Sequence, residues 1–199
     1  MGSTRTMRRA RVAVPLAAAF GLAFAVAAPA SASPAAVART GSQIQYSASA
    51  GTANTAVFSS SGGLLQVSDS AGLVPGPGCA AVSPTTVTCG AAATVTAING
   101  YGADGSDTLS AATLSVPVSL NGGPGQDTLQ GGGGNDRLTD PDGWAAAPAS
   151  ASISGGGGND QIVSRNGGFD KVDCGPGFDV VVADPAALDT VLNCEVVLR

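Results

Sequence analysis

The stretch NGGPGQDTLQGGGGNDRLT, residues 121–139, decides how the rest of this chain is interpreted. It consists of two nine-residue units laid end to end, so that Asp127 and Asp136 occupy the same position in successive units. Each aspartate is followed two positions later by a leucine, Leu129 or Leu138. The sequence after Gly100 can be described as further copies of this unit, as degenerate copies, or as caps on them.

Six units share three positions: a glycine, an aspartate two positions later, and an aliphatic residue two positions after that. Glycine permits a positive φ without a steric clash, and clustered carboxylate and carbonyl oxygens are the ligands that calcium prefers. After each turn the chain is expected to run extended, with the aliphatic side chain pointing inward as a period of two requires. The aspartates are Asp107, Asp127, Asp136, Asp160, Asp170 and Asp179.

These units resemble the nonapeptide of RTX, or haemolysin-type, calcium-binding repeats, GGxGxDxUx. The matches to its first six positions are GGPGQD at 122–127 and the two GGGGND copies at 131–136 and 155–160. The wider layout is similar to small secreted actinobacterial proteins in which a CGPGxD…CE segment, here residues 174–195, follows the repeats. The resemblance implies an all-β fold, a parallel β-roll, with calcium between stacked glycine turns. The implied metal ligands are the six aspartates together with Gly122, Gly131 and Gly155.

In such a β-roll two nonapeptides form one coil, so an aspartate stacks on the equivalent aspartate two units further along the chain. The resemblance therefore pairs Asp107 with Asp127 and Asp160 with Asp179. The partner of Asp136 depends on the insertion at 140–154. If the insertion contains a half-coil, Asp136 stacks on Asp160; if it is a plain loop, Asp136 stacks on Asp170 and Asp127 on Asp160. We expect two to four calcium ions.

Two interruptions of the repeats are expected to lack a metal site. Residues 110–120 contain no aspartate and predict one half-coil in which Leu114, Val116 or Val118 faces inward. The insertion at 140–154 begins Asp-Pro-Asp-Gly, which is more typical of a turn, and holds the only tryptophan, Trp144. Trp144 either packs on its own domain or anchors a partner.

Residues 41–98 are predicted to form a small β region that caps the repeats. Short runs of β-type residues, several of them alternating apolar and polar side chains, lie between glycine and proline turns. We interpret residues 33–40 as a flexible leader. The sequence thus divides into 33–98 as an N-terminal β cap region, 99–184 as the β-roll and 185–199 as a C-terminal cap. Segments that predict strands are 43–46, 56–58, 64–67, 86–88 and 94–96.

The segment 1–32 has the features of a signal peptide. A basic start that contains Arg8, Arg9 and Arg11 precedes an apolar run, and Ala30-Ser31-Ala32 forms a small-residue cleavage site. Without this segment the charge is 5 − 14 = −9, and 13 of the 14 acidic residues follow residue 98. Such an acidic chain repels nucleic acid and repels itself unless a cation neutralises it.

The four cysteines are typical of an exported protein. Four cysteines can form two disulfides in three ways, and we expect the arrangement with two local disulfides, Cys79 with Cys89 and Cys174 with Cys194. Each would close a short loop and contribute roughly 3 kcal/mol by limiting the entropy of the unfolded chain. A metal–thiolate cluster is the alternative, but the sequence has no CxxC pair.

The function that we predict is a secreted, extracellular calcium-binding β-roll that folds on binding the ion and has a structural or adhesive use at the cell surface. It is predicted not to be an enzyme, because the absence of histidine excludes HExxH sites and Ser-His-Asp triads. Alternatives are a non-catalytic polysaccharide-binding module or an accessory part of a secreted hydrolase. A disordered glycine-rich linker is the alternative for the repeats themselves, and without calcium we expect them to be disordered.

Overall fold

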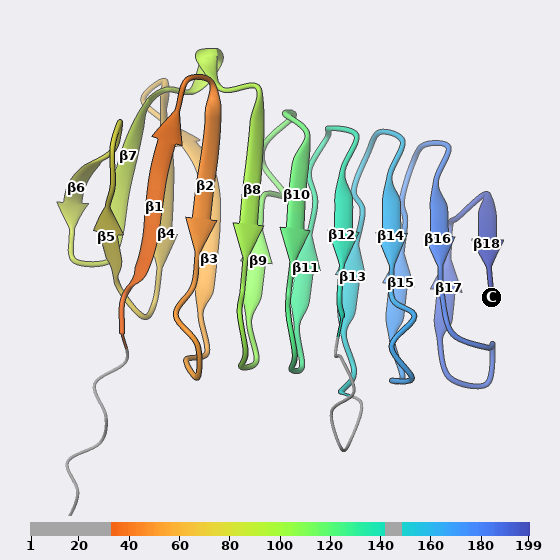
Figure 1. Ribbon diagram of the computed structural model, residues 1–199. Helices are drawn as coiled ribbons and strands as arrows, with labels where there is room; N and C mark the ends of the chain where they lie inside the picture. Colours follow the sequence, from red (N-terminus) through yellow and green to blue (C-terminus); the bar gives the residue numbers. More distant parts are fainter. Residues whose placement is uncertain (1–32, 142–148) are drawn as a thin grey trace, which may run out of the picture. The chain divides into compact units, whose positions relative to one another are not determined.

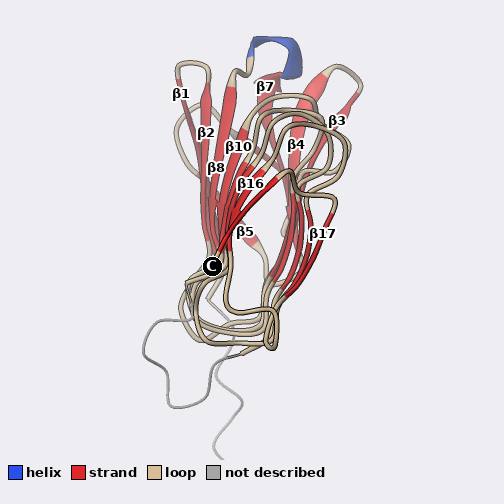
Figure 2. Ribbon diagram, turned by 90° about the vertical axis from the view of Figure 1, so that its right-hand side faces the viewer, coloured by secondary structure: helices blue, strands red, loops and turns tan. Residues whose placement is uncertain are grey.

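The computed structural model describes residues 33–141 and 149–199 of the chain. Over these residues the chain forms two nine-stranded sheets, whose strands lie side by side in Figure 1 and make two facing layers in Figure 2. The predicted all-β parallel β-roll is confirmed, because successive coils place one strand in each sheet. The predicted signal peptide at 1–32 and Trp144 lie outside the described residues.

In the repeats, strands from alternate half-coils pair in parallel, in the orders β8-β10-β12-β14-β16-β18 and β9-β11-β13-β15-β17. Most of these strands have only three residues, which is the length the nonapeptide leaves between two turns. Their bounds are β8 (Ala97–Tyr101), β9 (Thr108–Ser110), β10 (Val118–Asn121), β11 (Thr128–Gln130), β12 (Arg137–Thr139), β13 (Ser152–Ser154), β14 (Gln161–Val163), β15 (Lys171–Asp173), β16 (Val180–Val182), β17 (Thr190–Leu192) and β18 (Val196–Leu198).

The core of the repeats is two facing columns of aliphatic side chains, one from each sheet. The middle residue of each short strand points inward, and the register places it directly on its equivalent in the next coil. All of these side chains are buried. One column is Leu120, Leu138, Ile162 and Val181, and the other is Leu109, Leu129, Ile153 and Val172.

The N-terminal region contributes longer strands, several of them antiparallel, to the same two sheets. The prediction of a flexible leader at 33–40 is wrong, because β1 buries Ala35 and Val37 and pairs with β2 and β5. The strand predicted at 94–96 is also wrong, because residues 92–94 form a 3₁₀ turn before β8. The elements are β1 (Ala35–Thr40), β2 (Gln43–Ser47), β3 (Thr55–Ser61), β4 (Leu64–Asp69), β5 (Leu73–Pro75), β6 (Ala80–Ser83), β7 (Thr86–Ala91) and η1 (Ala92–Thr94).

The stack of parallel coils begins before the first repeat. Strand β2 pairs in parallel with β8, and β3 pairs in parallel with β9, so the segment 43–57 forms a first coil beneath the repeats. Phe58 of β3 and Leu120 of β10 both approach the Cα of Gly100, where a Cβ would lie 2.9 Å from a Leu120 methyl group. Glycine at position 100 therefore lets the ring of Phe58, from the N-terminal region, pack onto the core of the repeats.

The C-terminal segment adds one more coil. Strands β17 and β18 pair in parallel with β15 and β16, and β18 lies at the edge of its sheet. This segment is the one predicted as a C-terminal cap at 185–199. It pairs edge to edge with the preceding strands, and its residues Val191 and Val197 lie in register with Val172 and Val181 of the core columns.

The insertion at 140–154 resolves the open question about Asp136. It contains β13, so it supplies a half-coil, and β12 therefore pairs with β14. The half-coil predicted at 110–120 is also present, with Leu114 and Val118 buried. Both local disulfides are present, Cys79–Cys89 and Cys174–Cys194.

Candidate metal centre

The turns between strands stack in two columns, one at each side of the two sheets. The turns of the first turn column follow strands of the sheet that contains β2, β8 and β10. The turns of the second turn column follow strands of the sheet that contains β9 and β11. The residue at the aspartate position of each turn therefore lies next to the residue at the same position in the following coil. In the first column these residues are Asn54, Asp107, Asp127, Ala151, Asp170 and Asp189, and in the second they are Val118, Asp136, Asp160, Asp179 and Glu195.

One carboxylate oxygen of each column aspartate joins its coil to the preceding coil. The main-chain N–H of Asp107 donates to Oδ1 of Asp127 at 2.7 Å, and that of Asp160 donates to Oδ1 of Asp179 at 2.7 Å. Both predicted stacking pairs are thus confirmed. Asp136 stacks on Asp160, because its main-chain N–H donates to Oδ1 of Asp160 at 2.8 Å. Hydrogen bonds between an N–H and a carboxylate are among the strong ones, so these contacts fix the spacing of the turns.

The other carboxylate oxygen is left without a protein partner at several of these aspartates. Among the described residues, Oδ2 of Asp107, Asp160 and Asp179 is buried and accepts no hydrogen bond. The whole side chains of these residues are at most 1% exposed. A buried carboxylate oxygen without a donor is costly, unless a cation binds it.

The glycines leave space for that cation and surround it with oxygen atoms. A Cβ on Gly102 would meet Oδ2 of Asp107 and the carbonyl oxygen of Gly122, and a Cβ on Gly155 would meet Oδ2 of Asp160 and the carbonyl oxygen of Cys174. Carboxylate and carbonyl oxygens therefore converge between consecutive turns, which is the ligand set of a hard cation. The predicted ligands Gly122 and Gly131 lie in the same way against Oδ2 of Asp127 and Asp136.

A second set of carbonyl oxygens points from each turn toward the next. The carbonyl oxygens of Ala103 and Gly105 face the Cα atoms of Gly123 and Gly125. A side chain at these glycines would occupy the space between the turns. Glycine at Gly123 and Gly125, the second and fourth positions of this unit, is thus required by close approach as well as by a positive φ, which is +93° and +147°.

Burial raises the pKa of these carboxyl groups. The pKa of Asp107 is raised to about 6 by burial, against the lowering effect of the N–H of Asn54, and the charge of Asp127 raises it further. Burial also raises the pKa of Asp160 to about 6, and it raises the pKa of Asp136. Loss of water and mutual repulsion both disfavour the charged forms, so a bound cation would reverse the balance.

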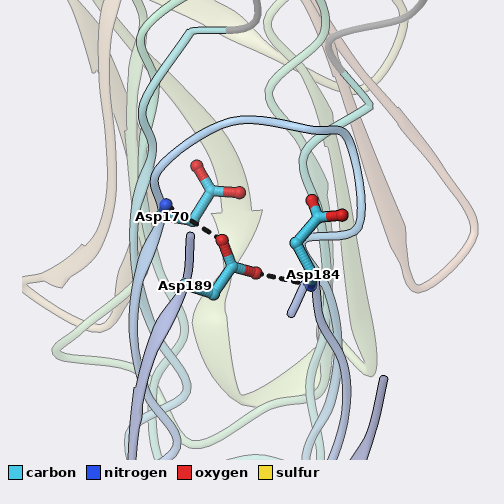
Figure 3. A group of neighbouring side chains, drawn as sticks. All are labelled: Asp170, Asp184 and Asp189. Atoms are coloured by element: carbon cyan, nitrogen blue, oxygen red, sulfur yellow. Dashed lines mark hydrogen bonds between the residues drawn. The ribbon is translucent and has the colours of Figure 1, made fainter. Parts of the chain in front are cut away.

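Three carboxylates meet near the C-terminal end of the first turn column (Figure 3). Asp170, Asp184 and Asp189 are buried and each places one oxygen within 4.8 Å of the others. The carboxylate of Asp189 accepts the main-chain N–H groups of Asp170 and Asp184, at 3.1 and 2.8 Å, which fixes the Asp189 side chain beside both residues. Among the residues predicted as ligands, only Asp170 belongs to this group.

The residues of the two columns fit calcium. Their donors are carboxylate and carbonyl oxygens, and the buried oxygens of Asp107, Asp160 and Asp179 need a positive partner. The aspartates with the main chain of the turn glycines and of Cys174 would hold the ion between turns. A bound calcium ion would supply positive charge to the buried carboxylates and link consecutive coils.

Sequence reasoning missed four residues of these turns: Asn54, Asp184, Asp189 and Glu195. A weak signal existed for two of them. Asp189-Thr190-Val191 and Asn54-Thr55-Ala56 have the polar–polar–aliphatic order of the repeats, but they lack the glycine two positions before. Glu195 has a longer side chain that reaches the N–H of Asp179 at 2.7 Å from a shorter turn.

Comparison with protein families identifies these repeats. The family of the RTX calcium-binding nonapeptide repeat, in four copies, matches residues 119–139 and 152–168. Comparison with curated proteins and with solved structures gives no match. The matched residues contain Asp127, Asp136 and Asp160, and RTX repeats bind Ca²⁺.

Proposed function

We propose that this RTX-type calcium-binding repeat protein is exported and folds on binding extracellular calcium. The folded β-roll then serves as a structural or adhesive component at the cell surface. Calcium sites of extracellular modules have dissociation constants of about 10⁻⁴–10⁻³ M, so such sites stay empty in a calcium-poor cytoplasm and fill outside. The chain would therefore leave the cell unfolded in its repeats and become rigid afterwards.

The observation that carries this proposal is the pair of carboxylate columns. Asp107, Asp160 and Asp179 each bury one oxygen that has no donor from the protein. The aliphatic core opposite them contributes only one inward side chain per three-residue strand. Burial of apolar area is worth about 25 cal/mol per Å², and ordering each residue costs about 1–2 kcal/mol. The small core therefore cannot offset both the ordering cost and the desolvated charge.

Two features support export. The segment 1–32 has the charge, the apolar run and the small-residue site of a signal peptide. The two disulfides, Cys79–Cys89 and Cys174–Cys194, are of a kind that persists in oxidising compartments. No helix of the described residues is long and apolar enough to span a membrane.

The proposed role is non-catalytic. The sequence lacks histidine, and the aspartates of the repeats already act as acceptors for the neighbouring coil. A general acid or base needs access to a substrate, whereas these carboxylates are buried between turns. Structural use of the carboxylates explains their positions without a reaction.

Far-UV circular dichroism of the purified chain tests the proposal. The chain is first stripped of divalent cations and then titrated with calcium, with magnesium as the control. We expect a cooperative gain of β signal with calcium that magnesium does not produce at the same concentration. An unchanged, folded spectrum in chelator and in calcium would mean that disulfides and the aliphatic columns hold the fold, and the proposal would be wrong.

A second candidate function, polysaccharide binding, is favoured by a surface recess of about 510 Å³ on the N-terminal region. Tyr101 is 46% exposed at one side of it and Val74 is 50% exposed at the other. The small residues Ala36 and Ser47 lie in register between them. An exposed aromatic ring beside small side chains can stack on a sugar ring. Pull-down with insoluble polysaccharide should then be lost in Tyr101→Ala and kept in Phe169→Ala, an exposed aromatic elsewhere.

A further inference from the structure

We propose that the calcium sites extend beyond the repeats, into the loop at 48–54 of the N-terminal region. This loop would hold one divalent cation, of the calcium type, against the turn at 102–107. The ligands from the loop are the side-chain oxygen of Asn54 and the main-chain carbonyl oxygen of Thr52. This inference rests on calcium binding by the repeats, and it adds a site that the nonapeptide motif does not describe.

Two hydrogen bonds show that the loop occupies the place of a repeat turn. The N–H of Ala48 donates to the carbonyl oxygen of Tyr101 at 2.8 Å, as Gly102 donates to Asn121 at 2.8 Å one coil later. The N–H of Asn54 donates to Oδ1 of Asp107 at 2.7 Å, just as the N–H of Asp107 donates to Oδ1 of Asp127 one coil later.

A third contact concerns the carbonyl oxygens between turns. A Cβ on Gly105 would lie 2.8 Å from the carbonyl oxygen of Thr52, just as a Cβ on Gly125 would meet the carbonyl oxygen of Gly105. The φ of Gly105 is +138°, so glycine is favoured there both by the positive φ and by the close approach of Thr52. The carbonyl oxygen of Thr52 therefore continues the line of carbonyl oxygens that the repeats direct into the space between turns.

The side chain of Asn54 is oriented by a buried carboxylate. Its Nδ2 donates to Oδ2 of Asp69 at 2.7 Å, and a carboxylate can only accept, so the amide nitrogen must face Asp69. Asp69 lies at the end of β4, on the side of β3 that faces away from β9. The amide oxygen is therefore on the opposite branch of the side chain, directed away from Asp69.

That amide oxygen has no donor. Oδ1 of Asn54 is buried and unpartnered, and the residue is 1% exposed. Oδ2 of Asp107, one coil later, is likewise buried and without a donor. Leaving a buried amide oxygen without a donor destabilises the fold, and a cation between the two turns would remove that cost.

Asp69 is not a ligand, because the protein itself satisfies it. Oδ2 accepts the hydroxyl of Tyr46 at 2.6 Å in addition to the amide of Asn54. Oδ1 accepts the N–H groups of Thr55 and Ala71 at 3.2 and 3.1 Å. Asp69 thus positions Asn54, and its charge also makes the neighbouring space more favourable for a cation.

Two further carboxylates contribute to that potential. Asp107 closes the upper turn, and Asp104 accepts the N–H of Gly51 at 2.7 Å from the same turn. The ligand from Asn54 is neutral, however, whereas the repeats supply a carboxylate at this position. Calcium affinity follows the number of charged ligands, so this site should fill at a higher calcium concentration than the sites between repeats.

The test counts bound ions on the full chain. Equilibrium dialysis against calcium, with metal analysis of the protein, is compared for wild type, Asn54→Ala and Asn99→Ala, the last being a partly exposed asparagine on β8. We expect Asn54→Ala to bind one ion fewer than wild type and Asn99→Ala to bind the same number. Equal numbers for all three proteins would overturn the inference while calcium binding by the repeats stands. A wild type that binds no calcium would overturn both.

The double variant Asn54→Asp/Asp69→Asn keeps the test decisive if Asn54→Ala does not fold. It reverses the hydrogen-bond pair, keeps the total charge, and gives the loop the carboxylate of a repeat turn. We expect it to bind as many ions as wild type, with the last ion bound at a calcium concentration lower by about tenfold, since ligand charge is increased. An unchanged concentration for that ion, or the loss of an ion, would overturn the inference.

Discussion

The N-terminal region and the repeats build the same two sheets, but they treat a buried carboxylate in opposite ways. Asp69 in the N-terminal region accepts four hydrogen bonds from the protein. Asp160 in the repeats accepts one, from the N–H of Asp136, and leaves its other oxygen buried without a donor. The comparison shows two ways to bury the same group: the chain supplies every donor, or it leaves a place for a cation.

The hydrophobic cores differ in the same sense. The N-terminal region packs Tyr46 edge-on against Phe58, with ring centres 5.7 Å apart. The repeats offer one aliphatic side chain per short strand. Aromatic packing adds about 0.5–1.5 kcal/mol beyond area burial. The N-terminal region should therefore be stable without calcium, and the repeats should not.

The largest effect is expected from removing a column carboxylate. Asp160→Ala loses a hydrogen bond to a charged group, worth about 1.5–3 kcal/mol, and one charged calcium ligand. We expect the calcium concentration at the midpoint of folding to rise about tenfold or more, measured by circular dichroism. Asp173→Ala is the control, because Asp173 is a partly exposed carboxylate on β15 outside the columns. An equal shift in both variants would mean that total charge alone matters.

A smaller effect is expected from glycine, and it differs between the two regions. Gly158 has a φ of +109° and a Cβ there would meet the carbonyl oxygen of Gly134, whereas Gly41 has a φ of +62° and open space. Gly41→Ala should cost about 1 kcal/mol, the strain of the left-handed region. Gly158→Ala should cost at least about 2 kcal/mol and should also weaken calcium binding. Thermal unfolding in saturating calcium measures both, and equal costs would contradict close approach of the turns.

The smallest effect concerns pH. Burial raises the pKa of Asp107 and Asp160 from 3.8 to about 6, so without calcium the folded state holds more protons than the unfolded state between these values. The fraction of folded repeats in calcium-free buffer, small as it is at neutral pH, should then be greatest below about pH 4 and fall as the pH rises through about 6. In calcium the dependence should reverse, because protons compete with the ion. A β signal in far-UV circular dichroism that stays the same between about pH 4 and pH 7, without calcium and at a fixed calcium concentration, would refute this linkage.

Much of the repeat architecture could be predicted from the sequence. The spacing of glycine, aspartate and leucine at 122–138 determines turn, ligand and inward side chain within a single unit, so local pattern and fold agree. The stacking partner of Asp136 could not be predicted, because the insertion at 140–154 has no aspartate at the turn position to mark its half-coil. Structure was needed to show that Ala151 takes that place.

The N-terminal region was harder to predict for a physical reason. Alanine is depleted in strands and fills three positions of β1, at 35, 36 and 38, which becomes a strand only through pairing with β2 and β5. The loop at 48–54 joins the first turn column through contacts with the turn at 102–107, which lies far away in the sequence. Its Asn54 has no glycine motif before it, so only the stacked coils reveal its position.

Hydrogen exchange with and without calcium tests the central claim most directly, because it reports stability strand by strand. In chelator, amides of β9–β16 should exchange fast while those of β1–β4 stay protected. Calcium should then protect β9–β16 and leave β1–β4 nearly unchanged. Equal protection of the repeats in chelator and in calcium would contradict the claim that a cation completes their buried carboxylates.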